Sequence, residues 1–266
     1  MLHDIGSNAR GAIVTPTQAA LLLVAGLAGG LVNAVAGGGS LITFPALLGI
    51  GLPPVSANVS NALSVAPGYA ASVLGSRADL TGQGQRVRQA IPAAVLGALC
   101  GSALLLSTPR AVFDVVVPFL VLGATAMLAF QAPLRRLAGQ SRVHSPRRAR
   151  ATLQLAVFLG GLYGGYFNAA LGVLLVAGLA LVLDESLRRV GALKNVLSAT
   201  VGVVTILIYS VFGPVNWAAT AVLVPATMIG GYLGARLASR LSSRLLRAVI
   251  LTFGTVVGLV LLVRAF

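Results

Sequence analysis

Two glycine-rich interruptions of long apolar runs are the features of this chain whose spacing could bind a ligand. Gly37-Gly38-Gly39 follows Asn33, and a looser set of glycines across 164–172 surrounds Asn168. Glycine exposes backbone amides, and a helix starting at Ser40 would point the positive end of its dipole at the break. The pattern predicts an anion site at membrane depth. The structural alternative is a simple packing kink.

Two further asparagines and a lysine lie within apolar segments and are also candidates. Buried amides are costly in lipid, so Asn61 and Asn195 should face the interior, as ligand groups or as interhelical hydrogen-bond partners. Lys194 is the only lysine. We expect the Lys194 side chain to follow one of two alternatives. It provides a positive charge for an anion bound near these two amides, or it extends to the membrane surface. The candidate substrate-binding residues are therefore Asn33, Gly37, Gly38, Gly39, Ser40, Asn61, Asn168, Gly172, Lys194 and Asn195.

Other kinds of chemistry find little support in the sequence. The five acidic residues fall at expected helix ends or loops, which argues against proton or sodium coupling through a buried acid. No His, Asp or Glu accompanies a serine within a span, so we expect no enzyme activity and no cofactor. His3 and His144 stand too far apart to suggest a metal site, and Cys100 is expected to be a buried, inert thiol.

Composition indicates a membrane protein. The 266 residues are 57% hydrophobic and 9% charged, whereas soluble domains carry about 25% charged residues. Since one span needs about 20 apolar residues, the chain can supply roughly eight to ten helical segments. The net charge of +14 comes from arginine tracts between apolar runs, which indicates cytoplasmic loops and not nucleic-acid binding.

An internal duplication organises the chain. Asn33 and Gly37 recur as Asn168 and Gly172, and Asn61-Ala62-Leu63-Ser64 recurs as Asn195-Val196-Leu197-Ser198. The Gly-x-x-x-Gly pairs at 97/101 and 230/234 also correspond, and they predict close helix packing. The expected division is a polar N-terminal segment at 1–16, a first transmembrane repeat at 17–130, a basic linker at 131–150 and a second transmembrane repeat at 151–266.

Each repeat begins with an interrupted apolar stretch, at 17–50 and 153–183, and three helices follow it. Those helices are expected at about 56–75, 89–107 and 111–130, and at 188–212, 216–238 and 245–264. Arginines place the linker, the 76–88 loop and the loop near 240 in the cytoplasm. Counting membrane crossings between these loops and the uncharged connectors, expected outside, requires each interrupted stretch to begin and end on the same side of the membrane. Each stretch is therefore predicted to be a hairpin, and the two repeats to have opposite orientations. The predicted fold is an all-α polytopic membrane protein with two inverted repeats.

Residues 30–34, 37–41 and Pro45 with Ala57 resemble the first half of the sulfite exporter (TauE/SafE) family. Residues 161–167, Lys194 and Gly213-x-x-Asn216-Trp217 resemble its second half. The resemblance implies a multi-pass transporter of the inner (plasma) membrane that exports small sulfur-containing anions such as sulfite or organosulfonates. The alternatives are an importer of another small organic or sulfur anion, and a non-transport intramembrane protein. The second break, Asn168 to Gly172, is poorer in glycine than the family pattern.

Overall fold

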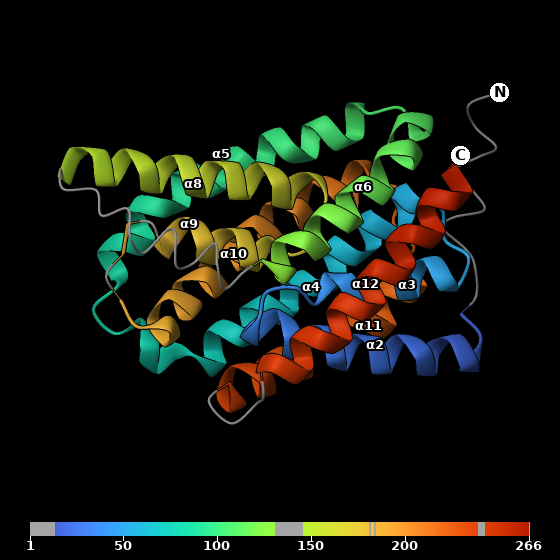
Figure 1. Ribbon diagram of the computed structural model, residues 1–266, viewed down its shortest axis with the longest axis horizontal. Helices are drawn as coiled ribbons and strands as arrows, with labels where there is room; N and C mark the ends of the chain where they lie inside the picture. The colour runs from blue at the N-terminus through green and yellow to red at the C-terminus, as the bar shows by residue number, and fades with distance from the viewer. Residues whose placement is uncertain (1–13, 131–145, 181, 184, 239–242, 266) are drawn as a thin grey trace.

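The computed structural model describes residues 14–130, 146–180, 182–183, 185–238 and 243–265, which form helices without a β-strand (Figure 1). The predicted all-α fold is confirmed. The first half contains α2 (Pro16–Val35), α3 (Ser40–Gly49), α4 (Pro54–Gly75), the short 3-10 helix η1 (Arg77–Leu80), α5 (Gly84–Ser107) and α6 (Arg110–Ala129). The second half contains α8 (Pro146–Tyr166), α9 (Leu171–Ala180), α10 (Leu187–Phe212), α11 (Trp217–Leu237) and α12 (Ser243–Ala265).

Helix length separates membrane-spanning elements from shorter ones. Among the described residues, five helical segments are long and apolar enough to cross a membrane: Pro16–Val35, Gly84–Ser107, Arg110–Ala129, Arg188–Phe212 and Trp217–Leu237. By contrast, α3 and α9 have ten residues each. At 1.5 Å per residue they are about 15 Å long, half of the hydrocarbon core.

Each short helix turns back along the helix before it. A capping box starts α2, in which Thr15 and Gln18 exchange hydrogen bonds. The Gln18 Nε2 atom also donates to the carbonyl oxygen of Ile50 at the end of α3, at 3.4 Å. In the second half, Gly178 of α9 faces Ala156 of α8. Both interrupted stretches are therefore helical hairpins.

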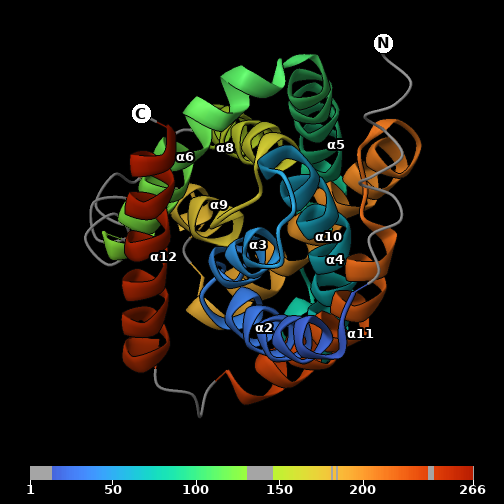
Figure 2. The same ribbon diagram turned by 90° about the vertical axis from the view of Figure 1, so that its right-hand side faces the viewer.

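The short helix of each hairpin, α3 or α9, lies at the centre of the molecule, and the longer helices, α2 and α8 among them, surround the pair (Figure 2). The first helix of each hairpin packs against a helix of the other half, α2 against α11 and α8 against α5, while α4 packs against α10. Side chains at Gly97 and Gly101 would collide with α8 carbonyls, and side chains at Gly230 and Gly234 with α2 carbonyls, so these glycines permit close backbone contact.

The hairpins begin at opposite sides of the molecule. In Figure 1, α2 begins on the right and α8 begins on the left. This exchange of partners and directions is what an inverted duplication would produce. The inverted relationship itself, the domain boundaries and the cytoplasmic location of the linker stay predictions. Residues 1–13 of the N-terminal segment and residues 131–145 of the linker lie outside the part of the chain that the structure describes.

The helix boundaries align the two breaks differently from the sequence match. The last residues of α2 and α8, Val35 and Tyr166, are 131 positions apart. The first residues of α3 and α9, Ser40 and Leu171, are separated by the same number. Gly37 therefore corresponds to Asn168, and both have positive φ, 82° and 64°. The sequence pairing of Asn33 with Asn168 is four residues out of register, because glycine and asparagine both tolerate the left-handed conformation that the turn requires.

Cys100 corrects another expectation. Its side chain is exposed on the surface of α5, in the middle of an apolar span. In a membrane-spanning helix, residues that face lipid and residues that face the protein interior are both apolar. The sequence around Cys100 therefore could not show which of the two surfaces carries the thiol. The thiol is therefore accessible from outside the helix bundle.

Candidate functional site

The two helix breaks meet at two glycines. The backbone N–H of Gly172 donates to the carbonyl oxygen of Gly37 at 3.2 Å. A Cβ on Gly37 would lie 2.5 Å from the Cα of Gly172, and the positive φ of Gly37 is unfavourable for other residues. Glycine at both positions therefore allows the first break to touch the start of α9.

Asparagine side chains order the first break. The Oδ1 atom of Asn33 accepts a hydrogen bond from the N–H of Gly39 at 2.6 Å. One turn along α3, Thr43 donates to the Oδ1 atom of Asn61 on α4. The Nδ2 atoms of both asparagines are buried without a hydrogen-bond partner. Each amide thus uses its acceptor within the protein and keeps its donor unused.

Lys194 reaches the first break from α10. Its side chain is 1% exposed, and its Nζ atom donates to the carbonyl oxygens of Asn33, at 2.6 Å, and Ala34, at 3.1 Å. These carbonyls belong to the last turn of α2, where the helix dipole is negative. The Lys194 stem passes beside Gly172. The ammonium group therefore lies at the break and does not snorkel to the membrane surface.

Polar side chains of α4 and α10 support the second break. Asn58 donates to the carbonyl oxygen of Tyr166 at 2.9 Å, and Tyr209 donates to that of Gly165. The Tyr69 hydroxyl lies 3.4 Å from the Oδ1 atom of Asn168. Sequence reasoning missed Asn58, Tyr69 and Tyr209. Asn58 carried a signal, since it precedes Asn61 by three residues and so shares a helix face with it.

Asn195 does not join this arrangement. Its Nδ2 atom donates to the hydroxyl of Ser76, at the end of α4, at 3.3 Å. The helices α4 and α10 run antiparallel, because Ser56 at the start of α4 donates to the Pro214 carbonyl just after α10. Asn61 and Asn195, each in the first half of its own helix, therefore lie toward opposite ends of the α4–α10 pair. This corrects the expectation that Lys194, Asn61 and Asn195 form one cluster. Successive helical side chains point about 100° apart, which separates Asn195 from Lys194.

The region around the breaks offers positive charge and hydrogen-bond donors. Besides Asn33 and Asn61, the Nδ2 atom of Asn168 is buried without a partner, as is the Ser40 hydroxyl. Gly38 and Gly39 are buried in the same turn. Acidic residues in the described part of the chain are Asp79, Asp114 and Glu185, all near helix ends. The described residues contain no cluster of His, Cys, Asp and Glu suited to a metal ion.

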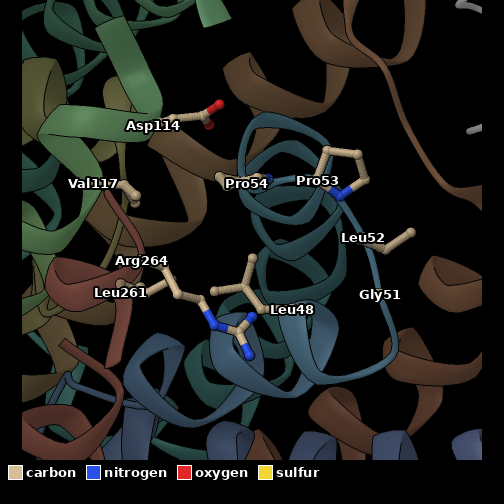
Figure 3. Close-up of a pocket in the computed structure, with 9 residues that line it drawn as sticks. All are labelled: Leu48, Gly51, Leu52, Pro53, Pro54, Asp114, Val117, Leu261 and Arg264. Atoms are coloured by element: carbon tan, nitrogen blue, oxygen red, sulfur yellow. The ribbon is translucent and has the colours of Figure 1, made fainter. Parts of the chain in front are cut away.

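A separate cavity of about 390 Å³ lies at one end of the bundle (Figure 3). It is lined by the end of α3, the start of α4, the first turns of α6 and the last turns of α12. Its lining residues are Leu48, Gly51, Leu52, Pro53, Pro54, Asp114, Val117, Leu261 and Arg264. None of the ten predicted site residues lines it.

Comparison with known proteins agrees with the membrane architecture. The family described as "Sulfite exporter TauE/SafE" matches residues 22–261. A "Probable membrane transporter protein" of Haemophilus influenzae is 26% identical over 87% of this chain and 89% of its own length.

Two further relatives carry similar names. The "Probable membrane transporter protein YfcA" of Escherichia coli K12 is 24% identical over 94% of this chain and 91% of its own length. The "Probable membrane transporter protein ORF9" of Sinorhizobium sp is 26% identical over 82% of each chain. No solved structure matches. The family match covers most of the chain, and this multi-pass membrane protein therefore belongs to the sulfite exporter TauE/SafE family of transporters.

Proposed function

We propose that the protein exports small sulfur-containing anions, such as sulfite or organosulfonates, through a site formed by the two helix breaks. The observation that carries this proposal is the buried ammonium of Lys194. Its two hydrogen-bond partners are carbonyl oxygens, and the acidic residues of the described part lie near helix ends. A buried charge without a countercharge is costly, so a bound anion would stabilise this arrangement.

The breaks supply the remaining contacts for an oxyanion. The N-termini of α3 and α9 bring positive dipole ends to the region where Gly37 touches Gly172. The unused amide donors of Asn33 and Asn168 can donate hydrogen bonds to the oxygen atoms of an anion. A sulfur oxyanion presents several acceptor oxygens in a small volume. The family description supports this substrate class.

Outward transport fits the same features. An inside-negative membrane potential drives anions outward with about 2.3 kcal/mol per charge per 100 mV. Export therefore needs no buried carboxylate to couple a cation. Import of an anion would have to overcome this potential with a coupled ion.

Flux measurements in proteoliposomes test the proposal. Purified protein would be reconstituted with sulfite, a short alkylsulfonate, sulfate or a monocarboxylate inside, and efflux followed at potentials set by a potassium gradient with valinomycin. We expect sulfite or sulfonate efflux that rises as the interior becomes more negative. A monocarboxylate preferred over every sulfur anion, or efflux equal to that of protein-free vesicles, would refute the proposed substrate.

A further inference from the structure

Glu185 ties the two halves together at the end of the bundle where α4 finishes. Its Oε1 atom lies 2.5 Å from Nη1 of Arg86 in the first turn of α5, and its Oε2 atom lies 2.7 Å from Nε of Arg189 in the first turn of α10. The Glu185 side chain is only 20% exposed. We refer to Arg86, Glu185 and Arg189 as the clasp. Since α5 follows the first hairpin and α10 follows the second, the clasp joins the two repeats.

Hydrogen bonds to backbone carbonyl oxygens reinforce the clasp. Arg189 Nη1 donates to the carbonyl oxygen of Thr81 at 3.1 Å. The buried Gln83 side chain donates to the carbonyl oxygens of Asp79, at 2.8 Å, and Arg189, at 3.0 Å. The connection between α4 and α5 is thereby fixed to the start of α10. Ser76, where this connection begins, is buried and accepts a hydrogen bond from Asn195.

The opposite end of the bundle is built differently. The pocket of Figure 3 includes Pro54 in the first turn of α4, whereas the clasp lies beyond Gly75, the last residue of α4. These 22 residues put about 33 Å between the two features. At the pocket end α4 is joined to the connection after α10 by neutral hydrogen bonds, from Ser56 to the Pro214 carbonyl and from the Asn216 N–H to Ser60.

We propose that the clasp is the gate at one end of the transport path and that the pocket is the vestibule at the other. The structure is then the conformation open at the pocket end. This inference rests on the proposed function, because a carrier with a central site exposes that site to one side at a time. Arg77, Arg86 and Arg88 place the clasp end in the cytoplasm by the positive-inside rule, so the state is outward-facing.

The vestibule is lined by one positive and one negative side chain among apolar residues. Arg264, from the last turns of α12, lines it and supplies positive charge, while Asp114 lies on α6 across from the α3 end (Figure 3). Leu48 lies on α3, whose first residue, Ser40, adjoins the break. Leu48 is eight positions from Ser40, about 12 Å along the helix, so α3 extends from the vestibule to the proposed site.

Cysteine accessibility in two places tests the gate. Single reporters, Leu261→Cys in the vestibule and Ser76→Cys beneath the clasp, would be introduced with Cys100→Ala and labelled by a membrane-impermeant maleimide from either side. With the clasp intact, we expect labelling at 261 and protection at 76. Glu185→Gln should slow labelling at 261 and speed labelling at 76, each roughly two- to fivefold, the range expected for exposed ion pairs.

Matched variants separate the clasp from a general charge effect. Asp79→Asn removes an acid from the same connection outside the clasp, and we expect wild-type labelling. Arg86→Gln should change labelling in the same direction as Glu185→Gln but by less, because it removes one of the two ion pairs that Glu185→Gln removes. Adding Arg86→Gln to Glu185→Gln should therefore change little. Since labelling needs no substrate, it is independent of the flux assay. If the labelling rates of Glu185→Gln and Arg86→Gln both equal that of Asp79→Asn, the proposed gate is refuted, whichever anion the protein carries.

Discussion

The backbone of Gly172 donates a hydrogen bond to the backbone of Gly37, so the two helix breaks are in direct contact. Neither residue has room for a side chain at this contact. A ligand held at one break would therefore lie next to the other, and a shift of one hairpin would act directly on backbone atoms of its partner.

Replacing Gly37 with alanine should reduce anion flux at least tenfold. The new Cβ would meet Gly172 and would force a non-glycine residue to φ +82°, a strain of about 1–3 kcal/mol. Flux in proteoliposomes, normalised to reconstituted protein, provides the measurement. Gly49→Ala in the same hairpin has open space around its Cβ and serves as the control. Wild-type flux through Gly37→Ala would mean that the contact is not required for transport.

Lys194→Ala should weaken the apparent affinity for the anion roughly ten- to hundredfold, since a hydrogen bond to a charged group contributes about 1.5–3 kcal/mol. The Lys194 ammonium also caps α2, so Lys194→Arg should impair transport as well, because a forked guanidinium does not fit the two carbonyl oxygens in the same way. Affinity per inserted molecule is the quantity to compare. An unchanged affinity in Lys194→Ala would assign the residue to helix capping alone.

Asn58→Leu should destabilise the protein by about 1–3 kcal/mol. The substitution removes the donor to the Tyr166 carbonyl and leaves that oxygen buried without its partner. Thermal unfolding in detergent would show the loss. Ser64→Ala on the same helix removes a bond only to the carbonyl of its own helix at Ser60, so it should change the midpoint much less. Equal midpoints for the two variants would contradict a cap at the end of α8.

The clasp should weaken only in acid. Hydrogen bonding from Arg86, together with that from Arg189, lowers the pKa of Glu185 below its ordinary value of 4.5. A carboxyl group with a lowered pKa contributes stability above the unfolded pKa and loses it as pH falls through the folded pKa. The labelling rate at position 76, divided by the rate of an exposed cysteine at the same pH to correct for thiolate content, should therefore stay low from pH 7 to about pH 5 and increase at more acidic pH. In Glu185→Gln this acid-induced increase should disappear.

Topology can be tested at two positions outside the described residues. We expect the linker at 131–150 to be cytoplasmic and both termini to face outward, from the arginine distribution and the crossing parity. Single cysteines at positions 140 and 266, without Cys100, should label from opposite sides of the membrane. Labelling of both from one side would contradict the hairpin count.

The sequence was sufficient for the helices and for the location of the breaks. The helix predicted at 188–212 is α10, Leu187–Phe212, because a long run of mostly apolar residues without proline forms a membrane-spanning helix. The break at Gly37 was visible because three glycines in succession end a helix. The second break was placed correctly but aligned wrongly, since Asn168 adopts the same turn without glycine.

The contacts of the site could not be predicted in the same way. Lys194 lies on the carbonyl oxygens of Asn33 and Ala34 because α10 packs beside the end of α2, a tertiary relationship that no local pattern encodes. Asn195 seemed equivalent to Asn61 by sequence, but the neighbours of each helix face decide its partner, which for Asn195 is Ser76.

The bond from Lys194 to α2 also has a consequence for biogenesis. Ala34 and Lys194 are 160 positions apart, so at about 5–20 residues per second the ribosome completes the lysine roughly 8–30 s after the carbonyl it caps. During that interval the end of α2 lacks this partner. The first hairpin therefore remains incompletely packed, or hydrated at the end of α2, until α10 is inserted. A truncated chain that ends before α10 would present this incomplete hairpin to cellular quality control.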